Sequence, residues 1–221
     1  MALNKLKYNS LNLTPAANKA IGFDSDADAL EATLEGGAMT FIKKITASSD
    51  STISFVDGSS DVVLDNTYKE YIFMFKDIHG SAESELTFNM SVDSGSNYNV
   101  TKTSTFFLSE NAENDSFRSI AYQTGSDLAQ GTGFKTLQRS TDFADADQSA
   151  AGILHLFNPS STTFVKHFTS RIQGMSNSPL SNDVYSAGYA NTTSAVNGVK
   201  FLVNSGNIDA GTIKLYGIKD S

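Results

Sequence analysis

The clearest pattern of apolar and polar positions lies at residues 153–168, where two runs rich in aromatic and β-branched side chains flank Asn158-Pro159-Ser160-Ser161. Such runs favour strands, and Pro, Asn and Ser favour a turn, so the stretch predicts a β-hairpin. With a loop at residues 159–162, Phe157 lies opposite Phe164 and Ile153 opposite Phe168 on one face of the hairpin. The other face is largely apolar as well. A hairpin on the surface of a lone sandwich alternates apolar with polar residues. We therefore expect cover on both sides, from the opposite sheet and from a second subunit or an N-terminal segment.

Residues 70–75 (EYIFMF) are likewise apolar on both sides of a strand, which places this strand in the middle of the assembly. One core does not use so many apolar faces. The aromatic residues of the two stretches are therefore expected to line the core or an interface between subunits: Tyr71, Phe73, Phe75, Phe157, Phe164 and Phe168.

From Met39 onward the chain shows short strand patterns separated by turn residues. Strands are predicted at residues 39–46, 52–56, 68–78, 85–92, 98–108, 117–122, 133–137, 152–157, 164–172, 184–189, 199–203 and 212–218. No segment after residue 40 shows a convincing apolar stripe of helical period, so the crossovers of a parallel sheet are missing. The pattern predicts an all-β fold, an antiparallel β-sandwich head of the jelly-roll kind.

The first 37 residues lack a sustained alternation and are interpreted as an N-terminal arm or attachment segment, followed by a β-sandwich domain at residues 38–221. Within the arm, residues 25–35 admit two interpretations. Ser25 is a suitable N-cap for a short helix with Leu30 and Leu34 on one face. The alternative is an extended arm whose leucines dock onto a neighbouring molecule.

Composition narrows the classes of function. The chain has no cysteine, which excludes disulfides, thiolate metal sites and a cysteine nucleophile. Its net charge of −8 and the absence of a basic cluster disfavour nucleic-acid binding. No apolar stretch is long enough for a membrane span, and no signal peptide is recognisable.

Catalytic and metal-binding patterns are also missing. The three histidines, His79, His155 and His167, follow no metal-ligand spacing, and neither a nucleophile elbow nor a phosphate-binding glycine loop is present. Asp142, Asp145 and Asp147 are the best candidates for cation ligands, although a solvated acidic loop is the favoured interpretation. We expect a protein that is not an enzyme and that uses no metal or other cofactor.

Several segments resemble a family of virion structural proteins of marine bacteriophages, described as tail fibre or tail-associated proteins. The similar segments are residues 4–25, 60–79, 94–107, 154–168, 191–195 and 205–218, ending in GTIKLYGI. The resemblance implies a β-sandwich head in the virion. It also implies a homotrimer that attaches to other virion proteins through its N-terminal arm.

The resemblance leaves three functions open. The first is a tail fibre or spike component that binds a host-surface glycan or protein. The second is a capsid decoration or cement protein that stabilises the shell. The third is a glycan depolymerase, for which the sequence offers no marked carboxylate pair. The first is preferred, with a place in the tail fibre favoured over the capsid surface.

Heads of this kind bind through loops at one end of the sandwich, so the long polar segments are the candidates for receptor contact. These are residues 109–116, 124–133, 140–151 and 174–187. The last holds three large side chains among Asn and Ser, namely Met175, Leu180 and Tyr185. An exposed Tyr in such surroundings is typical of sugar and protein contact surfaces; an ordinary long loop is the other interpretation.

Overall fold

The structure is a computed structural model that describes residues 22–23, 30–31, 38–142, 145–176 and 179–220. The chain divides into two units, Met1–Gly37 and Ala38–Ser221. In the first unit, β1 (Gly22–Phe23) pairs with β2 (Leu30–Glu31) in antiparallel orientation. The helix considered for residues 25–35 is therefore wrong at Leu30–Glu31, which are extended; the remainder of that segment lies outside the described residues.

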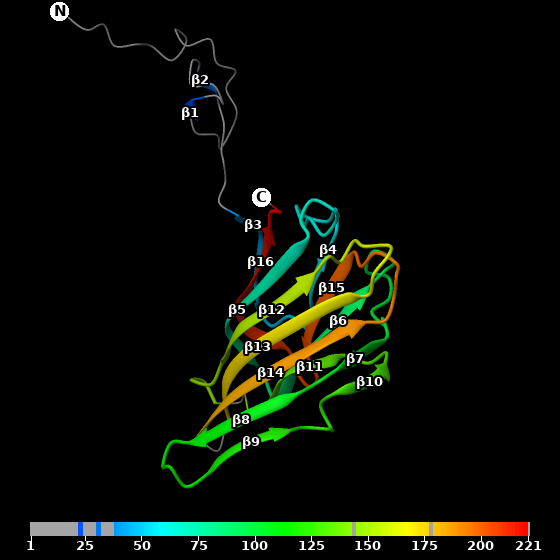
Figure 1. Cartoon of the computed structure of the whole chain (residues 1–221). Coiled ribbons are helices and arrows are strands. Elements are labelled where there is room, and N and C mark those ends of the chain that lie inside the picture. Colours follow the sequence, from blue (N-terminus) through cyan, green and yellow to red (C-terminus); the bar gives the residue numbers. More distant parts are fainter. Residues whose placement is uncertain (1–21, 24–29, 32–37, 143–144, 177–178, 221) are drawn as a thin grey trace, which may run out of the picture. The chain divides into compact units, whose positions relative to one another are not determined.

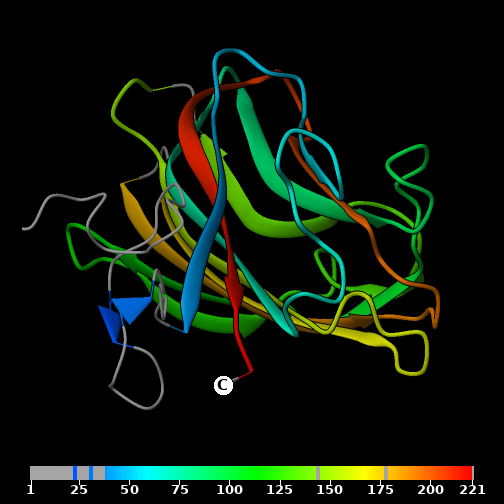
Figure 2. The same ribbon diagram turned by 90° about the horizontal axis from the view of Figure 1, so that it is seen from above.

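The second unit consists of two antiparallel sheets (Figures 1 and 2), which confirms the all-β sandwich. The larger sheet runs in the order β10-β7-β14-β13-β12-β5-β16-β3, with β8 beside β14 and β9 beside β8. Its strands are β3 (Met39–Thr46), β5 (Glu70–Gly80), β7 (Lys102–Ser104), β8 (Phe107–Ala112), β9 (Arg118–Tyr122), β10 (Leu128–Gly131), β12 (Ala150–Phe157), β13 (Lys166–Ser176), β14 (Leu180–Ala190) and β16 (Ile208–Ile218). The smaller sheet runs β11-β6-β15-β4, with β4 (Ile53–Val56), β6 (Glu83–Ser91), β11 (Lys135–Asp142) and β15 (Gly198–Val203).

The strand order is that of a jelly roll with additions. The partial order β3-β16-β5-β12 in one sheet and β4-β15-β6-β11 in the other is the double-sheet arrangement of eight strands. The remaining strands, β7 to β10 and the β13–β14 pair, enter as two insertions that widen the larger sheet beyond β12. These insertions carry the groove described below.

Aromatic rings from both sheets meet between them and form the centre of the core. Phe201 of β15 lies with its ring centroid 5.2 Å from that of Phe73 and 5.2 Å from that of Phe75, both on β5. Phe88 of β6 contacts Phe168 of β13 at 5.1 Å. Four of the six aromatic residues that were expected to be covered are buried in this core: Tyr71, Phe73, Phe75 and Phe168.

The predicted register of the hairpin at residues 153–168 is wrong. In the structure Leu156 pairs with Phe168 and Ile153 pairs with Arg171, because β13 begins only at Lys166. The connection between the strands is therefore longer than four residues, and Asn158, with φ of 45°, begins it. Phe164 lies in this loop and is 68% exposed, whereas Phe157 is half-buried on the outer side of β12.

Three of the predicted loops also overlap strands. Residues 174–187 were interpreted as a long loop, but Met175 lies within β13, which ends at Ser176. Leu180 begins β14, and the two strands pair along their whole lengths. Residues 124–133 contain β10, and residues 109–116 begin within β8. Polar residues occupy these strands because the outer face of the widened sheet meets water.

Three lysines are buried within the sandwich although lysine is seldom buried. Lys135 Nζ donates hydrogen bonds to the carbonyl oxygens of Ser126 and Thr136, both at 2.8 Å, and lies 4.5 Å from the Phe106 ring centroid. Lys102 Nζ donates to Asn89 Oδ1 and to the Val100 carbonyl. The third is Lys166. None of the ion pairs within the described part of the chain involves these lysines.

Candidate functional site

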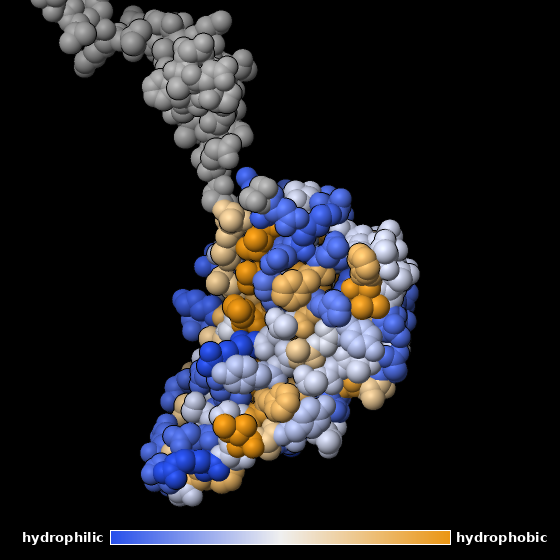
Figure 3. Space-filling view, viewed as in Figure 1, coloured by the Kyte–Doolittle hydropathy of each residue, from blue (hydrophilic) through white to orange (hydrophobic). Residues whose placement is uncertain are grey.

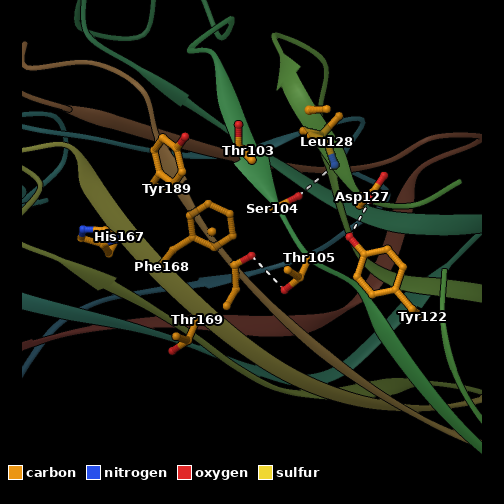
Figure 4. Close-up of a pocket in the computed structure, with 13 residues that line it drawn as sticks. Thr103, Ser104, Thr105, Tyr122, Asp127, Leu128, His167, Phe168, Thr169 and Tyr189 are labelled. Carbon is orange, nitrogen blue, oxygen red and sulfur yellow. Dashed lines mark hydrogen bonds between the residues drawn. The ribbon is translucent and has the colours of Figure 1, made fainter. Parts of the chain in front are cut away.

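An open groove of about 510 Å³ lies on the outer face of the larger sheet, where the inserted strands meet (Figure 4). Its wall on one side is the extended segment Thr103, Ser104 and Thr105, and its floor is formed by β13 and β14. Residues between β9 and β10 close the other side. The groove is thus built from strands added to the jelly roll, and its volume is within the usual range for small-molecule sites.

Gly188 on β14 allows the floor of the groove to form. A Cβ atom at this position would lie 2.4 Å from the Thr103 carbonyl oxygen and 2.7 Å from Phe168 Cζ. Any larger residue would therefore push β7 and the Phe168 ring away from β14. The Phe168 ring belongs to the core on one side and lines the groove on the other, which makes the floor rigid and apolar.

The hydroxyl groups along the β7 wall are already engaged in the protein. Ser104 Oγ accepts a hydrogen bond from the Leu128 amide at 3.0 Å, and Thr105 Oγ1 donates to the Ala187 carbonyl at 3.3 Å. Thr103 Oγ1 accepts from the Gln130 amide. These bonds join β7 to its neighbours, so the wall is fixed before any ligand arrives.

One carboxylate is held at the mouth of the groove. Tyr122 Oη donates a hydrogen bond of 2.6 Å to Asp127 Oδ2, and this bond raises the pKa of Tyr122 above its ordinary value. The second oxygen, Asp127 Oδ1, makes no hydrogen bond within the described residues. It is therefore available as an acceptor for a ligand hydroxyl.

The opposite rim carries polar groups with no hydrogen bond among the described residues: the His167 ring, the Thr169 hydroxyl and the Tyr189 hydroxyl. The His167 and Tyr189 rings are neighbours, with centroids 6.3 Å apart. The groove thus offers an aromatic ring, two hydroxyl groups and one imidazole without a hydrogen bond among the described residues, and one carboxylate. No Lys or Arg lines it, so it is suited to an uncharged, hydroxyl-rich ligand rather than to an anion.

The three residues predicted for receptor contact do not lie together. Tyr185 is 44% exposed on β14, where the Arg171 guanidinium stacks on its ring at 4.9 Å and bonds Asp183 at 2.8 Å. Leu180 lines a separate pocket of about 390 Å³ with Phe117 and Pro179. Met175 is half-buried at the end of β13. None of the three lines the groove.

The candidate cation ligands give no metal centre in the described part of the chain, where no cluster of three or more His, Asp or Glu residues is found. The Asp145 carbonyl accepts a hydrogen bond from Gln148, and its carboxylate is exposed with that of Asp147. The described side chains do not include that of Asp142. His79 and His155 each have a carboxylate partner, Asp209 at 2.6 Å and Glu70 at 2.9 Å, and lie in different parts of the sheet.

Sequence reasoning found one part of the groove and missed the rest. Asp127, Leu128 and Ala129 fall in the predicted loop at residues 124–133, whereas the β7 wall and the rim formed by His167, Thr169 and Tyr189 were not singled out. The alternation of polar residues on strands was the available signal: Thr103, His167 and Tyr189 face outward in one register row.

The fold and the groove define an antiparallel β-sandwich of the jelly-roll kind with an open groove that is lined by hydroxyl and aromatic groups. No family model, curated protein or solved structure matches the chain. Among the described residues, no helix has the length and hydropathy needed to cross a bilayer.

Proposed function

We propose that this chain is a bacteriophage virion structural protein, a homotrimeric tail fibre or spike component that adheres to the host surface. The observation that carries the adhesive role is the preformed groove between β7, β13 and β14. The jelly roll adds support by analogy, because the same architecture serves in viral capsid and lectin domains. The resemblance of residues 60–79 and 154–168 to virion proteins supports the setting.

The ligand that suits the groove is a neutral saccharide of the host surface. A pyranose ring presents an apolar face that packs on aromatic side chains such as Tyr189. Its hydroxyl groups supply donors to Asp127 Oδ1 and partners to Thr169 and His167. Glycans that carry sialate or sulfate lack a cationic partner here, so we expect them to be excluded.

Substitutions in the groove test this role. We expect Asp127→Asn and Tyr189→Ala each to weaken adsorption of the purified protein to host cells by at least about tenfold, because each removes a central contact. Tyr189→Phe separates ring packing from hydrogen bonding, since it keeps the ring and loses only the hydroxyl. The measurement is titrated cell binding, supplemented by a panel of neutral and acidic oligosaccharides.

The matched control is Phe117→Ala, which removes an aromatic ring that is 46% exposed but lies outside the groove. It should bind as the unmodified protein does. Unchanged adsorption by both Asp127→Asn and Tyr189→Ala would refute the groove as the adhesive site.

The position of the chain in the particle tests the setting separately. Imaging of intact virions should show copies in threes at the tail. Hundreds of copies over the shell would instead indicate the decoration function. The exposed apolar surface of β3, β5, β12 and β16 also suits that function, because a cement protein needs a broad contact area.

A further inference from the structure

A second surface, remote from the groove, carries apolar side chains on the outer side of the jelly-roll strands β3, β16, β5 and β12. We name it the apolar face and define it by Met39, Phe41, Ile72, Met74, Ile153 and Tyr216. Four of these residues are between 36% and 54% exposed: Met39, Phe41, Met74 and Ile153. Figure 3 shows hydrophobic residues gathered over β3, β16 and β5 on this side of the sheet.

Strand register makes the apolar face continuous. Ile153 lies opposite Met74, Ile72 opposite Tyr216, and Tyr216 opposite Phe41, so each side chain has an apolar neighbour on the next strand. The rings of Phe41 and Tyr216 meet edge to face with centroids 5.6 Å apart. Along these strands, residues of the apolar face alternate with the buried core residues Tyr71, Phe73 and Leu215. The apolar face is therefore the second apolar side of strands whose other side forms the core.

The size of the apolar face suits contact with another protein molecule. Four strands at about 4.8 Å spacing and three register rows at about 6.7 Å cover a flat area on the order of 400 Å². Protruding side chains add further accessible surface. Faces of this size, brought together between copies of the chain, would bury on the order of 1,000 Å² of accessible surface, the lower limit for a specific interface. The same rows also hold charged residues: Lys214 lies opposite Met74, Lys44 lies opposite Lys214, and Glu70 lies opposite Ile218 in the row of Met39.

The place where the N-terminal chain joins the head identifies the occupant. Residues 1–37 lead directly into β3, and Met39 is the first residue of that strand and a member of the apolar face. Copies that meet through this face would therefore have their attachment segments start from one shared region. The groove lies at the other end of the sheet, beyond β13, so it stays open when the face is covered.

We infer that the apolar face is the interface between copies of this chain, and that it is covered by the apolar faces of the other two copies, which meet around one threefold axis. The inference rests on the proposed homotrimer and adds the surface that holds it together. Burial of Phe41, Met74 and Ile153 supplies the driving force, because each now exposes more than a third of its surface to water. The Glu70–His155 pair at 2.9 Å supplies polar specificity within the same strands.

The oligomeric state of the full-length chain tests the inference. The unmodified protein should sediment as a multiple of the 23.7 kDa monomer, and Phe41→Glu with Met74→Glu should return it to the monomer mass. The matched control is Ile120→Glu on β9, because Ile120 is 82% exposed and lies outside the face. Its mass should be unchanged. A monomeric unmodified protein, or a double variant that stays oligomeric, would overturn the inference.

Cysteine cross-linking adds a readout that does not depend on destabilising the protein. The chain contains no cysteine, so Ile153→Cys introduces a single thiol within the face, on its β12 side. Mild oxidation should join two copies through it, whereas Ile120→Cys should remain uncross-linked at the same concentration. If cell adsorption through the groove persists in the monomeric double variant, the adhesive function holds independently of the interface. Equal cross-linking at both positions would contradict the assignment of the face.

Discussion

Replacement of Phe201 with alanine should lower the free energy of unfolding by about 3 to 5 kcal/mol, the range observed when large aromatic residues are truncated in a packed core. Phe201 is fully buried on β15, and its ring contacts Phe55 within the smaller sheet and Phe73 and Phe75 in the larger one. Its removal therefore leaves a cavity at the point where the two sheets meet. The surrounding rings on β4, β5 and β6 cannot collapse into that cavity without moving both sheets.

Urea unfolding at a fixed protein concentration, so that any association contributes equally, measures this effect. The control is Phe164→Ala, because Phe164 is 68% exposed in the loop after β12 and should change the stability by less than about 0.5 kcal/mol. Similar small effects for both variants would mean that the two sheets do not share one core.

The contrast between these two phenylalanines shows how far the sequence predicts the fold. Alternation and turn residues predicted all-β architecture and the strand at residues 39–46 with its observed bounds. They did not predict the hairpin register, because a turn of four residues and a longer loop fit the same Asn-Pro-Ser-Ser signal. A shift in register changed the partner of Ile153 from Phe168 to Arg171 and left Phe164 outside the strands.

The groove was less predictable than the fold, for a physical reason. Its walls come from β7, β10, β13 and β14, which become neighbours only through the long-range pairing of two insertions. Periodicity gives the face on which Thr103 and Tyr189 lie but not which strand lies beside which. The contribution of Gly188 is likewise invisible before β7 is placed against it, since the close contact is with the Thr103 carbonyl.

The buried lysines were not anticipated because composition treats lysine as a surface residue. Lys135 follows Phe134 and begins KTLQ, residues 135–138, a run that mixes polar and apolar side chains and gives no sign of burial. In the structure that strand is the edge strand of the smaller sheet beside β6, and Lys135, Leu137 and Gln138 are nevertheless all buried. A buried ammonium group without a carboxylate partner has a measurable consequence for stability.

The free energy of unfolding should rise by about 3 kcal/mol between pH 7 and pH 10 through Lys135 alone. Burial lowers the pKa of this lysine to about 7 in the folded protein, against an ordinary value of 10.5. In this window the unfolded chain therefore holds a proton that the folded protein has released. Because the unfolded state binds more protons, stability increases with pH until the lysine titrates in the unfolded chain as well. Burial also lowers the pKa of Lys102, to about 8, which adds a smaller rise in the same direction.

The variant Lys135→Met isolates this effect, because it keeps the aliphatic stem over the Phe106 ring and removes the titrating group. Urea unfolding at pH 7, 8.5 and 10 should show that the free energy of unfolding rises less steeply with pH in this variant than in the unmodified protein. The control is Lys44→Met, at an exposed position on β3, which should retain the full slope. The comparison must stop near pH 10, since burial raises the pKa of Tyr71 and ionisation of that tyrosine in the unfolded chain reverses the trend above this point. The free energy of unfolding could instead have the same slope with pH in the unmodified protein and in Lys135→Met. Lys135 would then contact water or a counter-charge in solution, and the interior at β11 would be more open than the packing of Phe106 and Leu137 indicates.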